Sequence, residues 1–171
     1  GAAGTNSGGT AAGAGGAKGT ATLILDSTTV TGATTVGDDG EGAITTQTAA
    51  VAFPNEIGTV AKKLGLMTTN IETTFDKNVY VDSLVSGAID VIFSGTTKQV
   101  LSGPITGTGD MILHAAAIVD STTTSASVVD TLDLAANAAT SLTLNGGLTI
   151  TVDTGLTVGA ASNLVLGSGL V

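Results

Sequence analysis

Residues 141–158, SLTLNGGLTITVDTGLTV, carry the clearest structural signal in this chain of 171 residues. Between 148 and 152, apolar side chains alternate with threonine, and such alternation predicts a β-strand with one buried face. The Asn-Gly at 145–146 and the Asp-Thr-Gly at 153–155 predict turns on either side of this strand. Short strands that recur every 8–12 residues or so indicate a sandwich, a barrel or a β-solenoid.

The same rhythm continues toward the N-terminus. β-Branched and small apolar residues predict strands near 21–25, 28–36 and 43–53, the last of them ended by Pro54. A compact apolar run at 88–93 lies between two glycines and predicts a further strand. We therefore expect an all-β fold with a sandwich-like or jelly-roll body, and a β-solenoid is the alternative.

Residues 55–67 are the one helical candidate. Ile57, Val60, Ala61 and Leu64 have the i, i+3, i+4, i+7 spacing of a helical stripe. Asn55 and Gly65 suit the two ends of a helix. The sequence thus predicts at most one short helix in the β body.

Residues 1–20 differ from the rest of the chain. They consist mostly of glycine and alanine, and they contain no side chain larger than Lys18. Such a segment buries too little apolar area to offset its ordering entropy alone. We expect an arm or linker over 1–20, either flexible or ordered only against another subunit, and a single β domain over 21–171.

The composition excludes several classes of function. The chain contains no cysteine and no tryptophan, 5 Lys+Arg against 14 Asp+Glu, and a net charge of −9. An acidic chain lacks the basic footprint of a nucleic-acid binder, and no apolar run is long enough for a membrane span. With His114 as the single histidine, acid–base pairs at useful spacing are not evident, so we expect a protein that is not an enzyme.

One acidic loop is the candidate metal site. Asp38, Asp39 and Glu41 stand close together in the sequence VGDDGEGA. Carboxylate oxygens on a glycine-containing loop suit a hard cation, so calcium is the one cofactor considered, although the spacing does not match an EF-hand. The alternative is a solvated acidic turn.

The phrase at 103–113, GPITGTGDMIL, resembles the G-x-I-x-G-x-G-x-L-x-L phrase of autotransporter-type β-solenoid passengers and related surface adhesins. Residues 141–171 have a similar rhythm. A small, threonine-rich, cysteine-free chain with a small-residue arm also resembles, in architecture, the extracellular filament proteins that polymerise by donor-strand exchange.

These resemblances and the low charge lead to one expectation about function. Charged residues are 11% of the chain, and a surface of Thr, Ser and Gly suits burial against copies of itself. We expect an extracellular or cell-surface structural protein, found in filaments, sheaths or biofilms, that self-assembles as a homopolymer by β-strand addition. A β-solenoid adhesin or other binding module, or a virion structural protein, are the alternatives.

Overall fold

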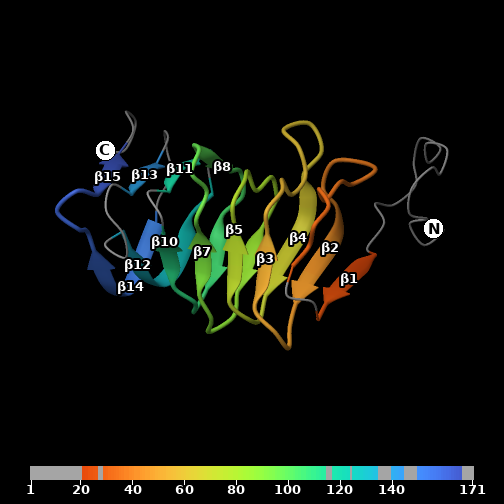
Figure 1. Ribbon diagram of the computed structural model, residues 1–171, viewed down its shortest axis with the longest axis horizontal. Helices are drawn as coiled ribbons and strands as arrows, with labels where there is room; N and C mark the ends of the chain where they lie inside the picture. Colours follow the sequence, from red (N-terminus) through yellow and green to blue (C-terminus); the bar gives the residue numbers. More distant parts are fainter. Residues whose placement is uncertain are drawn as a thin grey trace.

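The described chain is all β. The computed structural model describes residues 21–26, 29–114, 117–123, 125–134, 140–144 and 150–166, and within them the chain forms fifteen strands and no helix. The strands lie side by side along the long axis, from β1 at the N-terminal end to β14 and β15 at the C-terminal end (Figure 1). The predicted arm, residues 1–20, and the predicted turn at 145–146 lie outside the described residues.

The strands form three sheets. Sheet A has the order β1 (Thr22–Leu25), β2 (Glu41–Thr46), β4 (Leu64–Thr69), β6 (Leu84–Ser86), β9 (Ile105–Gly107). Sheet B has the order β14 (Ile150–Thr157), β12 (Ser127–Asp133), β10 (Met111–Leu113), β7 (Val91–Phe93), β5 (Thr73–Phe75), β3 (Val51–Phe53). Sheet C has the order β15 (Asn163–Leu166), β13 (Ser141–Leu144), β11 (Ile118–Ser121), β8 (Gln99–Leu101).

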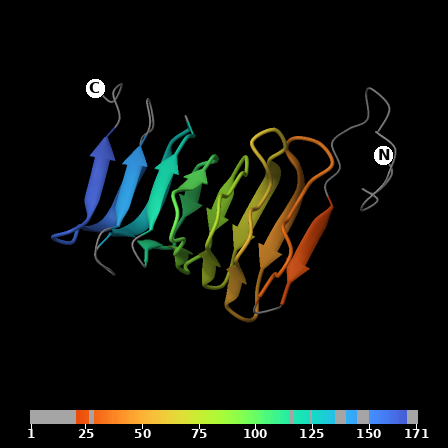
Figure 2. The same cartoon turned by 45° about the horizontal axis from the view of Figure 1, so that its top comes forward.

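Every strand pair in these sheets is parallel, and this decides the fold. Thr22 lies opposite Ala43, Thr73 opposite Val91 and Val119 opposite Leu142, so one coil takes roughly 20 residues. From β1 to β11 the chain passes through the positions of sheets A, B and C in turn and then begins the next coil beside the last, whereas β12 to β15 alternate between sheets B and C (Figure 2). Three single-residue bridges, Thr34–Ile57, Ile57–Val79 and Val79–Leu101, extend sheet C from β8 toward the N-terminus. The molecule is a β-solenoid.

The expected sandwich or jelly-roll body is therefore wrong, and the alternative of a solenoid is the fold observed. Sandwiches and jelly rolls are built from antiparallel strands. Alternation at 148–152 predicts that one face of a strand is buried, but it does not give the direction of the neighbouring strand.

The predicted helix at 55–67 is also wrong. Ile57 and Leu64 are buried, but they belong to two different sheets of the coil, and Val60 between them is 74% exposed. Gly58 has a φ of 66°, outside the helical range. The apolar spacing arises because a corner of the coil separates two inward-facing residues.

Several strands differ in extent from the prediction. The stretch 43–53 is broken by a corner into β2 and β3. Residues 29–34 contribute only bridges to their neighbours. The Asp-Thr-Gly at 153–155 does not turn the chain, because β14 continues through it with a register shift opposite Val129 and Thr131. A β-bulge absorbs the extra residue that a turn was expected to use.

Three stacked phenylalanines mark the core of sheet B. Phe53, Phe75 and Phe93 occupy equivalent positions in successive coils and are all buried. Ring centroids are 5.6 Å apart in both pairs, with interplanar angles of 20° and 36°. Leu113 continues the column in the next coil. These rings are the largest fully buried side chains, so the column buries apolar area between three successive coils.

We expect Phe75→Ala to destabilise the fold by about 3–5 kcal/mol, because Phe75 has an aromatic neighbour on both sides. Phe75→Leu, which places the residue type of Leu113 in the same column, should cost less. Urea unfolding followed by far-UV circular dichroism measures both. Equal losses for the two variants would show that the ring contacts themselves, and not the apolar volume that leucine keeps, stabilise the column.

Gly107 lies at a corner where a side chain has no room. Its φ is 135°, and a Cβ atom there would lie 1.8 Å from the carbonyl oxygen of Ser86, its neighbour in the preceding coil. Adjacent coils could not keep their spacing around an alanine. Gly107 belongs to the phrase at 103–113 that resembles the glycine-containing phrase of β-solenoid passengers, and the close approach between coils explains this glycine.

Gly107→Ala should therefore destabilise the protein by at least about 2 kcal/mol through backbone strain. Gly32→Ala is the matched control, because an added Cβ at Gly32 meets no atom within 4 Å. Thermal unfolding of the two variants should separate them clearly. A Gly107→Ala variant as stable as Gly32→Ala would mean that the corner relaxes without cost.

Candidate functional site

Within the described residues, sheet A ends at β1, and the outer edge of this strand is unpaired. Among the described strands, β1 pairs with β2 alone. Leu23 and Ile24 are 53% and 54% exposed, although Leu23 stands in register with the buried Ile44. An inward-facing leucine is exposed here because no described coil covers it. Unpaired strand edges with apolar side chains are sites of strand addition.

The outward-pointing backbone groups of β1 follow from its internal hydrogen bonds. The N–H groups of Ala43 and Gln47 donate to the carbonyls of Ala21 and Leu25, at 2.8 and 3.0 Å. Because backbone groups of successive residues point to opposite sides of a strand, Thr22 and Ile24 direct their N–H and C=O groups toward the open edge.

A second unpaired edge lies at the C-terminal end of the described strands. Within the described residues, β14 and β15 are the outermost strands of sheets B and C. Leu156 on β14 is 52% exposed, and Val165 on β15 is 44% exposed. Leu156 stands in register with Leu132, which is buried. The two ends thus expose residue types that the middle coils bury.

Two carboxylates of the acidic loop at 38–41 accept hydrogen bonds from backbone N–H groups. Asp39 Oδ1 accepts the N–H of Lys63 at 2.9 Å, and Glu41 Oε2 accepts the N–H of Asp38 at 3.3 Å. Lys62 Nζ donates to the carbonyl of Gly37. In the part of the chain that the structure describes, no three His, Asp or Glu side chains are placed to hold a metal ion together. Calcium binding at Asp38, Asp39 and Glu41 stays a prediction.

A second set of carboxylates, which sequence analysis did not connect, lies along sheet B. Glu72, Asp90 and Asp110 each precede a strand of this sheet, and the register places them one above another in successive coils. Partial burial raises the pKa of Asp90, and the negative charges of Asp110 and Glu72 raise that pKa further. Only the coil length, roughly 20 residues, could have predicted this ladder from the sequence.

Because the pKa of Asp90 is higher in the folded chain, ionising this group opposes folding. The contribution of protonated Asp90 to the free energy of unfolding is fully present below the pKa that Asp90 has in the unfolded chain. This contribution is lost as the pH rises through the higher pKa of Asp90 in the folded chain. Asp90→Asn should therefore stabilise the fold at pH 7 by roughly 0.2–1 kcal/mol, the usual size of a cross-strand like-charge effect. The gain should disappear below about pH 4. Urea titrations at both pH values measure it, with Asp82→Asn as the control for the same charge change outside the ladder.

A polar groove runs along the corner between sheets C and A. It has a volume of about 320 Å³ and is lined by Lys63, Val81, Asp82, Ser102, Pro104, Thr122, Thr123 and Ser125. The hydroxyl of Ser102 donates to the carbonyl of Val81 and accepts its N–H, both at 2.9 Å. Thr123 Oγ1 accepts the N–H of Ser125 at 3.1 Å. Much of the hydrogen-bonding capacity of this groove is thus used within the protein.

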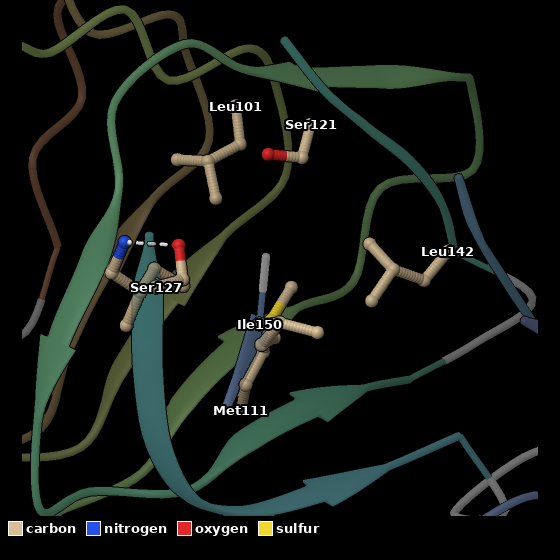
Figure 3. Close-up of a pocket in the computed structure, with 7 residues that line it drawn as sticks. Leu101, Met111, Ser121, Ser127, Leu142 and Ile150 are labelled. Atoms are coloured by element: carbon tan, nitrogen blue, oxygen red, sulfur yellow. Dashed lines mark hydrogen bonds between the residues drawn. The ribbon is translucent and has the colours of Figure 1, made fainter. Parts of the chain in front are cut away.

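A small cavity lies inside the solenoid, bounded by four successive coils (Figure 3). Its volume is about 10 Å³, which is at the lower limit for one water molecule. Ser127 Oγ accepts the N–H of Ile105 at 3.1 Å, and Leu101, Met111, Leu142 and Ile150 form the apolar wall. The cavity is too small for a substrate and reflects imperfect packing between coils.

His114 donates its backbone N–H to the carbonyl of Phe93 at 2.8 Å, a bond of the coil ladder. Within the described residues, no helix is long and apolar enough to cross a membrane. Comparison with protein-family models, curated proteins and solved structures finds no match.

Proposed function

We propose that this chain is a structural protein that assembles with copies of itself through the open edges at the two ends of its solenoid. The observation that supports this most directly is the exposure of Leu23 and Leu156, whose register partners Ile44 and Leu132 are buried. A second solenoid placed end to end would remove this apolar area from water and pair the free N–H and C=O groups.

The two ends differ, so the contact between copies is head to tail. A head-to-tail contact joins two different surfaces and leaves a free surface of each kind, and repetition gives an open filament. The sequence predicted β-strand addition between sandwich-like subunits, and the same kind of addition is proposed here between solenoids. The proposed setting is an extracellular filament, sheath or surface layer, as the low charge and hydroxyl-rich composition suggest.

A binding module is the second candidate, and the polar groove between sheets C and A favours it. A volume of about 320 Å³ lies at the lower end of the range for small-ligand sites. A chain with this function would stay monomeric at high concentration, so its oligomeric state separates the two candidates.

The proposal predicts that the mass of the particles formed by the full chain increases with concentration. Ile24→Pro should reduce this association at least several-fold, because proline removes an N–H that faces the open edge while the bonds of Ala21 and Leu25 to β2 remain. Multi-angle light scattering over a concentration series, with negative-stain microscopy of the concentrated samples, measures the effect.

Ile24→Val is the matched control, because it keeps both the N–H and an apolar side chain. Thermal unfolding of both variants at low concentration checks that the coil itself is intact. A wild-type chain that stays monomeric at every concentration would contradict the proposed function.

A further inference from the structure

We infer that β14 accepts β1 of a second copy in a single register, with Leu23 of the incoming chain opposite Ile150 and Leu25 opposite Val152. This inference rests on the proposed function and specifies the interface through which copies would join. Two properties of the described strands support it, a continuous side-chain column and the direction of the outward-facing backbone groups, and the position of two carboxylates makes it testable.

The column runs through sheet A from β1 to β9 and continues into the first residues of β12 and β14, which belong to sheet B. Leu23, Ile44, Met67, Leu84 and Ile105 occupy equivalent positions in successive coils. The column then passes to Ser127, whose hydroxyl accepts the N–H of Ile105, and ends at Ile150, the register partner of Ser127. Leu23 and Ile150 are thus the first and last described members of one column. A second copy stacked in register would continue it without a break.

The free backbone groups agree with this register. Asp130 donates its N–H to the carbonyl of Gly109 at 3.1 Å. The backbone N–H and C=O groups of Val128 and Asp130 therefore point toward the preceding coil, whereas those of Ser127 and Val129 point toward β14. In a parallel pair, the residue opposite a bonded residue directs its own groups to the other side. The backbone N–H and C=O groups of Ile150 and Val152 therefore point toward the outer edge of β14.

The incoming strand has the complementary phase. Thr22 and Ile24 of β1 face outward, as shown by the bonds of Ala21 and Leu25 to the next strand. The backbone of Ile150 would bond to Thr22 and Ile24 of the second copy, on either side of Leu23. This is the arrangement that Leu23 itself makes around Ile44 in one chain. A shift by one residue would break this phase and turn the apolar side chains outward.

The same register brings two acidic side chains together. Asp26 follows Leu25, and Asp153 follows Val152, and both are exposed. Stacked copies would place these carboxylates on the same outer face, one coil apart, where like charges directly opposite are destabilising. End-to-end association would then be weak at low ionic strength and stronger when salt screens the pair.

Engineered disulfides test the register, because the chain has no cysteine of its own. Adjacent parallel strands are about 4.8 Å apart, within the Cα separation that a disulfide allows. We expect the pair Leu23→Cys with Ile150→Cys to form a ladder of covalent oligomers on mild oxidation, seen on a non-reducing gel. The pair Leu23→Cys with Val152→Cys is two residues out of register and should cross-link at least roughly five-fold less, because its Cα atoms would be about 8 Å apart.

Charge variants give an independent test. Asp153→Asn should lower the concentration for half-maximal association at low salt by roughly two- to five-fold, and the difference should vanish in about 1 M salt. Asp82→Asn, which removes an exposed carboxylate away from both ends, is the matched control and should have a smaller effect.

The outcomes separate this inference from the proposed function. Association with equal cross-linking of the two cysteine pairs, or with no response to Asp153→Asn, would overturn the register and leave end-to-end assembly standing. Absence of association for every variant at every salt concentration would overturn both.

Discussion

The structure depends on the in-register stacking of one coil on the next. Each strand has a buried face because a neighbouring coil covers part of its side chains and pairs its backbone, and no strand of three or four residues could do this alone. Ile57 and Val79 are buried through contacts with the coils before and after them. Stability is therefore close to a sum of contacts between neighbouring coils. Both the aromatic column and the tight corner at Gly107 are properties of that stacking.

Local features of the fold could be predicted from the sequence, whereas the topology could not. Alternation and β-branched residues predicted an all-β chain, and β1 and β7 lie within predicted segments. The direction of strand pairing is not encoded in alternation, so antiparallel sandwiches and parallel coils remained open. The prediction of a helix at 55–67 was wrong because the coil places Ile57 and Leu64 on different sheets. A corner between them gives the two buried residues the same spacing as the apolar stripe of a helix.

The candidate site was only partly predictable for the same reason. The sequence predicted β-strand addition between copies but not the strands involved, β1 and β14, because an edge is a property of the assembled sheet. The loop of Asp38, Asp39 and Glu41 was found because its members are adjacent in sequence. The ladder of Glu72, Asp90 and Asp110 was missed because its members are separated by a full coil or nearly so. Residues that a solenoid brings together are recognisable only when the coil length is known.

The uneven distribution of large side chains has a consequence for the dynamics of the rod. The three phenylalanines lie in consecutive coils, in β3, β5 and β7, whereas the outermost described strands β1, β14 and β15 contain no aromatic side chain. In a one-dimensional array, ordering spreads outward from the best-packed repeats and is lost first at the tips. The terminal coil, to which the next copy must bind, is then the coil that unfolds locally most often. The rate of elongation would therefore be limited by the fraction of time in which the terminal coil is fully folded.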